Sequence, residues 1–415
     1  MKKHFTKLFS VITCISLTAC GAHVGGNAPA ELMRLTPDIA APSSDVSVST
    51  DAYIPLVRFC SDFTLATAQR SDGKSNTLTS PLSAYLALAM VKEGADGKTL
   101  EEMSAAMGDI SGEDIYSLIS HLTTLENTTL NIADSVWVDD SFTPKQAFLD
   151  TLAKHYLAEG FKIDLTSAEH DVNSWIEERT NTLIKNMLND TALDNAVMAL
   201  INTLYMEAKW ANEFASEATH EREFTNADGT KKNVDFMYKS ASLGVIESDA
   251  YIGVMLPYSD GSLTFVALMP KRSDAAAVET FEHVYRDGGW AAVAKTAVSE
   301  EIKLYLPKFE QKASGSLVDT LRSMGIVSAF DIDHASFAGI AEEIYIEQVF
   351  QNTVLKLDEA GTEAAAATVV VVAPTSAMPS PTQPRTVEFN RPFAFSVIDT
   401  ASGAVLFTGE HNTAN

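Results

Sequence analysis

Apolar side chains follow two different spacings along this chain, and the two dominate different parts of it. A spacing of three to four residues, typical of amphipathic helices, predicts helices over 51–70, 81–107, 143–156 and 172–188. Alternation typical of strands predicts strands over 130–138, 197–205, 263–269, 302–306, 393–398 and 405–407. Helices come first and strands are concentrated late, so we predict an α+β fold with mixed sheets.

One segment combines the features of a linker with those of a strand. Residues 358–372 read Asp-Glu-Ala-Gly-Thr-Glu-Ala-Ala-Ala-Ala-Thr-Val-Val-Val-Val, and a proline-rich stretch follows. Gly361 provides a backbone pivot, small side chains follow it, and the valines have a high strand propensity. Such a segment could slide between two existing strands and become a new one. A surface linker, or an ordinary strand followed by a loop, would have the same composition.

The alternation of side chains tests whether this segment suits a strand with one buried face. If Thr362 faces the core, the same face carries Ala364, Ala366, Thr368, Val370 and Val372, none of which is charged. Glu363, the one charged residue of the run, falls on the opposite face. The segment therefore meets the requirement for insertion into a sheet.

Several short motifs place this segment in a known context. Residues 359–368 resemble the hinge of the reactive-centre loop in inhibitory serpins, which are suicide inhibitors of proteases. Seven further motifs resemble serpin landmarks and occur in the family's order: Ser80-Pro81-Leu82-Ser83, Asn202 to Tyr205 running on to Lys209-Trp210, Leu256-Pro257-Tyr258, Leu306 to Phe309, Met324-Gly325-Ile326, Phe389 to Phe393, and Val405 to Gly409. The resemblance covers roughly residues 51 to 411.

This resemblance implies a fold and a mechanism. The fold would have three β-sheets, eight or nine helices and an exposed reactive-centre loop at about 359–386. A target serine protease would acylate itself on the loop, and the cut loop would insert as a new strand and trap the enzyme as a covalent complex. The implied protein is a monomer that needs no cofactor. A serpin-fold binding protein that no longer inserts its loop is the alternative, and the permissive Thr362 favours inhibition.

The resemblance also implies which residues control insertion. The hinge would comprise Glu359, Gly361, Thr362, Glu363, Ala364, Ala365, Ala366, Ala367 and Thr368. The shutter and breach regions, which open for the new strand, would comprise Ser80, Ser83, Asn202, Trp210 and Gln351. Gln351 stands where the family has a buried histidine, and Met206 to Trp210 replaces the usual Phe-Lys-Gly-Lys-Trp. Both departures leave the efficiency of inhibition open.

The spacing of the family also implies which peptide bond the protease would cut; we call it the bait bond, or reactive bond. Sixteen residues on from Glu359, the reactive bond would join Thr375 and Ser376; Ala377-Met378 and Val372-Ala373 stay open because the loop is about six residues longer than usual. The side chains before Ser376 are small or apolar, which favours an elastase-like or subtilisin-like protease. Arg385 would suit a trypsin-like enzyme but lies ten residues too late.

The N-terminal residues are typical of export. Residues 1–19 combine lysines, a short apolar run and Leu17-Thr18-Ala19-Cys20, which resembles a bacterial lipobox. We expect Cys20 to carry lipid, residues 20–50 to form a flexible tether, and 51–415 to form the serpin domain. An ordinary cleaved signal, or a chance cysteine, is the alternative. The expected location is the cell envelope, at the outer membrane or cell surface, and the sequence leaves periplasmic against surface exposure open.

Composition and charge narrow the possible partners. The chain has 415 residues, 46% of them hydrophobic, and a formal net charge of −25. No lysine or arginine occurs from Thr99 to Pro144, where heparin-activated serpins carry basic residues, so nucleic-acid and heparin partners are disfavoured.

The sequence lacks several motifs that are typical of enzymes and metal sites. It has no Gly-x-Ser-x-Gly, no His-Glu-x-x-His, no phosphate loop and no Cys/His metal spacing, which predicts a protein that is not an enzyme and holds no metal. Of the three cysteines, Cys60 would remain alone in the mature chain, on the buried face of the first helix.

Overall fold

The structure is a computed structural model, and it describes residues 32–180, 188, 193, 196–346, 349–362 and 384–414. Several predicted site residues lie outside these ranges: Cys20, Glu363 to Thr368, Thr375 and Ser376. The α-helices in the described ranges are α1 (Ile54–Ala68), α2 (Pro81–Lys92), α3 (Gly97–Met107), α4 (Gly112–Thr123), α5 (Gln146–Thr151), α6 (Glu169–Arg179), α7 (Glu279–Arg286), α8 (Trp290–Ala294) and α9 (Val318–Ser323).

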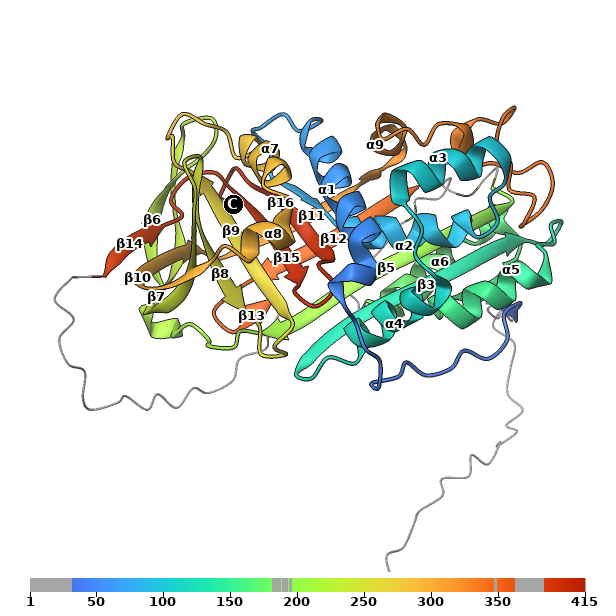
Figure 1. The fold of residues 1–415 in the computed structure, drawn as a ribbon, viewed down its shortest axis with the longest axis horizontal. Helices are drawn as coiled ribbons and strands as arrows, with labels where there is room; N and C mark the ends of the chain where they lie inside the picture. Colours follow the sequence, from blue (N-terminus) through green and yellow to red (C-terminus); the bar gives the residue numbers. More distant parts are fainter. Residues whose placement is uncertain are drawn as a thin grey trace, which may run out of the picture. The chain divides into compact units, whose positions relative to one another are not determined.

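The described strands occur mostly after residue 190, in agreement with the predicted order (Figure 1). They are β1 (Met33–Arg34), β2 (Thr77–Thr79), β3 (Thr128–Asp139), β4 (Glu159–Ile163), β5 (Met198–Lys209), β6 (His220–Thr225), β7 (Lys231–Glu247), β8 (Tyr251–Pro257), β9 (Leu263–Pro270), β10 (Val298–Pro307), β11 (Phe309–Ser316), β12 (Phe350–Leu357), β13 (Gly361–Thr362), β14 (Arg385–Glu388), β15 (Phe393–Asp399) and β16 (Val405–His411).

The helix predicted over 81–107 is two helices, and the break has two local causes. The Asp96 side chain caps the start of α3 by accepting a hydrogen bond from Gly97 N at 2.7 Å. Gly94 packs so closely on another segment that an added Cβ would lie 2.1 Å from Ile340 Cγ1. The helix predicted over 143–156 begins only at Gln146 and closes with a wider turn through Tyr156.

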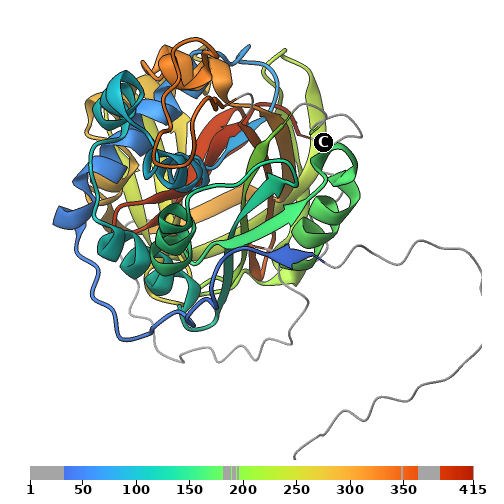
Figure 2. The ribbon, with the colours of Figure 1, turned by 90° about the vertical axis from the view of Figure 1, so that its right-hand side faces the viewer.

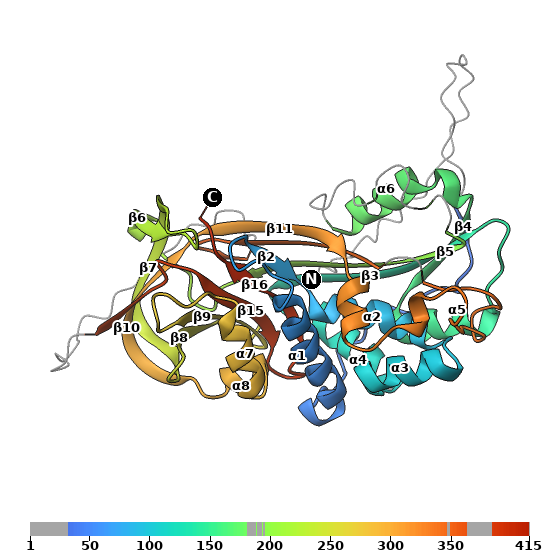
Figure 3. The same ribbon diagram turned by 90° about the horizontal axis from the view of Figure 1, so that it is seen from above.

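A seven-stranded sheet contains the long strands that matter for function. Its order in the described residues is β1-β4-β3-β5-β13-β12-β11. Figure 3 shows α2, α3 and α4 on one face of these strands and α6 on the other. At one edge, β1 pairs antiparallel with β4, and Figure 2 shows it lying along that edge. Residues 33–36, assigned to the tether by composition, are therefore docked here, with Thr36 Oγ1 accepting from Gly160 N at 3.0 Å.

A second sheet has the order β14-β10-β7-β8-β9-β15-β16-β2, with β6 paired to β7. Along one edge, β7 pairs with β10; along the other it pairs first with β6 and then with β8. This one long strand joins what the resemblance implies as two separate sheets. The sheet thus contains the second and third expected sheets, continuous through β7.

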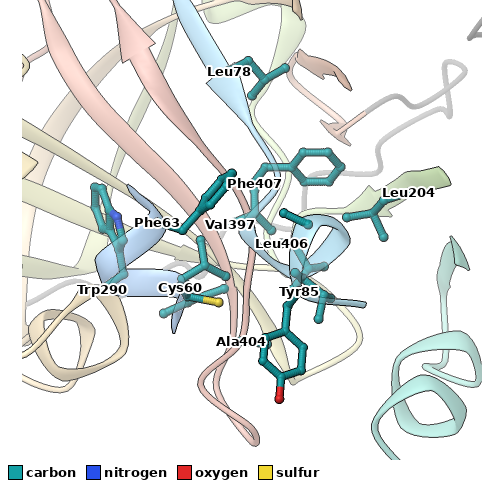
Figure 4. Close-up of a cluster of buried hydrophobic side chains, with 14 of the residues drawn as sticks. Cys60, Phe63, Leu78, Tyr85, Leu204, Trp290, Val397, Ala404, Leu406 and Phe407 are labelled. Carbon is teal, nitrogen blue, oxygen red and sulfur yellow. The ribbon is translucent and has the colours of Figure 1, made fainter. Parts of the chain in front are cut away.

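The core lies between the first two helices and the last strands. Cys60 and Phe63 of α1 and Tyr85 of α2 pack toward Leu406 and Phe407 of β16 (Figure 4). Cys60 is fully buried, as predicted, and burial raises the pKa of its thiol to about 12, which leaves it unreactive. No helix in the described ranges is long and apolar enough to cross a bilayer.

Candidate functional site between strands β5 and β12

The candidate site is the place where the chain after β12 turns back into the seven-stranded sheet. Gly361 and Thr362 form β13, which pairs antiparallel with β5 on one side and with β12 on the other. Gly361 lies opposite Lys209, and Thr362 lies opposite Ala208 and Leu357. Among the described ladders, the rest of this edge of β5 has no partner strand. The sheet thus already holds the first two residues of an additional strand.

Gly361 is needed for close packing rather than as a pivot. Its φ is not in the left-handed region, and a Cβ at this position would lie 2.0 Å from Ala208 O and 2.8 Å from Lys209 Cα. Because both contacts are to backbone, neither could move aside. The sequence predicted that Gly361 provides a backbone pivot. The structure shows instead that a side chain at this position would clash with the backbone of β5.

Thr362 is buried on the core side of the sheet, which is the condition under which the alternation leaves the core-facing set uncharged. Its hydroxyl lies 2.6 Å from the hydroxyl of Tyr258. Burial raises the pKa of Tyr258, so its phenol stays neutral and can donate or accept here. Tyr258 was identified only as part of a landmark motif, and its contact with the hinge was not predicted.

Trp210 makes hydrogen bonds to the backbone of this turn and packs against neighbouring aromatic rings. Its indole Nε1 donates to Asp358 O at 2.9 Å, and its backbone N donates to Ala360 O at 2.9 Å. The indole stacks on Tyr258 with ring centroids 4.6 Å apart, and it contacts Phe214 edge-on. The predicted breach residue is thus the main support of the hinge backbone.

Glu359 is fixed by two side chains from other strands and loops. Thr219 Oγ1 donates to Oε1 at 2.7 Å, and Lys308 Nζ lies 3.0 Å from Oε2. Partial burial opposes ionisation, but these two partners outweigh it and hold the pKa of Glu359 below its ordinary value. Phe214 N also donates to Glu359 O at 2.8 Å. The entry to the hinge is therefore a charged, well-anchored position.

The other predicted residues lie further along β5 and β12, next to the start of α2. They form two neighbouring groups of hydrogen-bonded polar side chains. Gln351 of β12 accepts at Oε1 from Ser80 N at 2.9 Å and from Thr79 Oγ1 at 2.7 Å, and donates from Nε2 to Ser80 O at 2.8 Å. Ser83 Oγ donates to Asn202 Oδ1. Gln351 thus satisfies the backbone at the start of α2 without a titratable group.

Asp134 completes this group and was missed. Asn202 Nδ2 donates to Asp134 Oδ1 at 2.6 Å, while Oδ2 is buried with no hydrogen-bond partner. Burial outweighs the Asn202 bond and raises the pKa of Asp134 to about 7. The alternation of side chains along β3 could have revealed it. Asp134 falls on the same face of the strand as Leu130 and Val136, and both of these are buried.

The C-terminal side of the loop is anchored in the other sheet. Arg385 begins β14, which pairs in parallel with β10. Its guanidinium contacts Glu247 at 2.8 Å and Glu300 at 2.8 Å. Arg385, placed by the sequence inside the loop, is therefore part of a strand. All three candidate reactive bonds and the alanine run lie in 363–383, outside the described residues.

A serine, a histidine and an aspartate also converge, but not as a catalytic triad. His121 Nε2 lies 3.2 Å from Asp399 Oδ1 and 3.4 Å from Ser262 Oγ, and Ser262 donates directly to Asp399. A triad needs one imidazole nitrogen for each partner, whereas here a single nitrogen faces both. The carboxylate of Asp399 also accepts from Ser402 N at 2.8 Å, so the cluster fixes the β15–β16 turn. In the described part, no three His, Cys, Asp or Glu side chains form a potential metal site.

Comparison with known proteins gives consistent matches. A family model described as Serpin (serine protease inhibitor) matches residues 56–413. A serine protease inhibitor of Cyanea capillata is 30% identical over 354 residues, covering 81% of this chain and 92% of that protein.

Solved structures agree with these matches. The thermophilic serpin tengpin in its native state gives a TM-score of 0.80 at 32% identity, covering 91% of this chain and 98% of that one. Tengpin in its latent state gives 0.72 at 29% identity, covering 87% and 98%. Human thyroxine-binding globulin gives 0.76 at 22% identity, covering 88% and 100%, a likeness that concerns the fold alone.

Proposed function

The chain belongs to the serpin family, most of whose members inhibit proteases and some of which do not, and from this premise we propose that it is an inhibitor. The predicted α+β serpin fold is confirmed. The observation that carries the proposal is the pairing of Gly361 and Thr362 between β5 and β12, with Thr362 buried. Because the first two hinge residues are already paired in the sheet, the residues after them can extend the same strand once the loop is cut.

The proposed mechanism needs no catalytic group on this chain. A protease attacks the loop and becomes acylated, and the freed arm then extends β13 along β5 and β12. Each added residue gains ladder hydrogen bonds, and alternate side chains become buried, so insertion releases the free energy stored in the uncut form. About fourteen inserted residues at ~3.3 Å each would move the protease by roughly 46 Å.

We place the bait bond at Thr375-Ser376, with Ala377-Met378 and Val372-Ala373 as alternatives. The residues before Ser376 are Val372, Ala373, Pro374 and Thr375, all small or apolar. A shallow, uncharged specificity pocket accepts such residues, so the proposed target is an elastase-like or subtilisin-like serine protease.

We also propose that the protein is anchored at the cell envelope through lipid on Cys20. The support is the sequence Leu17-Thr18-Ala19-Cys20 after a short apolar run. Metabolic labelling with palmitate should mark the wild type and not Cys20→Ala. Equal labelling of both proteins would rule out this anchor.

The inhibitory proposal is tested with a panel of pancreatic elastase, subtilisin and trypsin. The purified protein should form SDS-stable complexes with elastase or subtilisin, and the released C-terminal peptide should begin at Ser376 by mass spectrometry. A peptide beginning at Ala373 or Met378 would keep the protease class and move the bond. Cleavage by every protease without any stable complex would favour the alternative, a non-inhibitory serpin-fold binding protein.

A further inference from the structure

A lysine of the second sheet reaches the segment that holds the hinge. Lys239 lies on β7, opposite Leu304 of β10. Its Nζ donates a hydrogen bond to the backbone O of Asn212 and lies 4.2 Å from the centroid of the Phe214 ring. Asn212 and Phe214 belong to the connection between β5 and β6. Lys239 therefore attaches this connection to β7 at two points.

The same connection carries contacts that hold the entry to the hinge. Phe214 is buried, its backbone N donates to Glu359 O at 2.8 Å, and its ring contacts Trp210 edge-on with centroids 6.2 Å apart. The backbone N of Trp210 donates in turn to Ala360 O at 2.9 Å. Lys239 is thus linked to Glu359 through Phe214.

The charge of Lys239 strengthens both of its contacts. A protonated amine donates a stronger hydrogen bond to a carbonyl than a neutral one, and a cation is attracted to the face of an aromatic ring. Burial lowers the pKa of Lys239 to about 8, although the negative charge of Glu213 on the same connection opposes this shift. Leu304, the facing residue on β10, carries no charge. The ammonium form therefore predominates at pH 7 and the neutral amine above about pH 9.

We propose that Lys239 is a positioning residue for inhibition. Its ammonium group holds Phe214 in place, and Phe214 holds Glu359 where the chain enters β13. When the ammonium is lost, the hinge leaves the sheet more often. Insertion must then first re-form β13, so it competes less well with hydrolysis of the acyl bond. The inference rests on the proposed function, because slower insertion matters only if insertion traps the protease.

Hydrogen exchange on the intact protein tests the anchoring without a protease. At pH 7 the amides of Trp210 and Phe214, which donate to Ala360 O and Glu359 O, should exchange at least about twofold faster in Lys239→Met than in the wild type. Lys239→Arg keeps the charge and should restore the protection. Lys232→Met, which changes an exposed lysine of the same strand, should have no effect. Unchanged exchange in a folded Lys239→Met would overturn the inference.

The second readout is the number of inhibitor molecules consumed per elastase molecule trapped. At pH 7 the wild type and Lys239→Arg should agree, and Lys239→Met should consume roughly two- to fivefold more. At about pH 9.5 the wild type should approach Lys239→Met, while Lys239→Arg should stay lower by the same factor. Comparing variants at one pH removes the pH dependence of elastase itself, and the wild type and Lys239→Arg suffice if Lys239→Met folds poorly.

Two outcomes separate this inference from the proposed function. The same pH profile for the wild type and Lys239→Arg would overturn the role of Lys239. Faster exchange in Lys239→Met, without stable complexes of the wild type at any pH, would confirm the anchoring and refute the proposed inhibition.

Discussion

The hydroxyl groups of Tyr258 and Thr362 lie 2.6 Å apart, in the core beneath the seven-stranded sheet. Tyr258 is itself stacked on Trp210, whose indole bonds to the backbone at Asp358. The Thr362 side chain thus attaches the hinge to the aromatic cluster, in addition to the pairing of β13 with β5 and β12. In this account, insertion of the cut loop extends a strand that exists already.

Gly361→Ala should weaken this hinge. The added Cβ would lie 2.0 Å from Ala208 O, and the backbone of β5 cannot yield without losing its pairing with β3. We expect a loss of about 1–3 kcal/mol in the free energy of unfolding, measured by denaturant titration. Gly315→Ala is the matched control, because its Cβ would meet no atom within 4 Å. Similar losses in both variants would show that the close approach at Gly361 is unimportant.

Asp134 should make stability depend on pH. In the unfolded chain its carboxyl loses the proton near the ordinary pKa of 3.8, whereas burial keeps it protonated in the fold up to about 7. The folded state therefore binds more protons between these values, and stability falls as pH rises from about 4 to 7. The full cost, present above pH 7, is at most about 4 kcal/mol.

Asp134→Asn should remove that dependence while keeping an acceptor for Asn202. The variant and the wild type should have similar unfolding midpoints at pH 4, and the variant should be more stable at pH 8. A constant difference between the two proteins across this range would show that Asp134 does not titrate as its burial requires.

Arg385 should resist trypsin although it is close to the proposed bait bond. Its backbone pairs with Ile302 and its guanidinium contacts Glu247 and Glu300, so the bond to Thr386 must first leave β14. We expect cutting at Arg385 to be at least about tenfold slower than elastase cutting within 363–383. The double variant Glu247→Gln, Glu300→Gln should speed it up. A peptide beginning at Thr386, released from the wild type at the elastase rate, would contradict this.

Local patterns predicted much of the fold and part of the site. Alternation predicted β3 and β5 of the first sheet and β9, β10, β15 and β16 of the second, since period-two spacing reports directly on which face is buried. It did not predict β7, β8, β11 or β12. The burial of Thr362 agrees with the face on which the alternation test placed it. The helix over 81–107 was too long, because the apolar spacing continues through a break fixed by Asp96 and by the contact of Gly94 with Ile340. Spacing alone contains no information on such contacts.

The remaining features depend on residues far apart in the sequence. Glu359 is held by Thr219 and Lys308, and Thr362 by Tyr258, which lie on different strands and loops. Residues 33–36 have the composition of a tether and yet add β1 to a sheet edge, because an edge strand offers unpaired backbone groups to any extended segment. Only the three-dimensional arrangement reveals these partners.

The central claim is that insertion starting at Thr362 traps the protease, and Thr362→Arg tests it most directly. The variant would bury an unpaired charge next to Tyr258, which slows insertion and lets the acyl bond hydrolyse. The measurement is the number of serpin molecules consumed per elastase molecule trapped, with Thr362→Ser as the matched control. We predict a value near the wild type for serine and complete turnover as a substrate for arginine. Wild-type stoichiometry and SDS-stable complexes in Thr362→Arg would contradict the account.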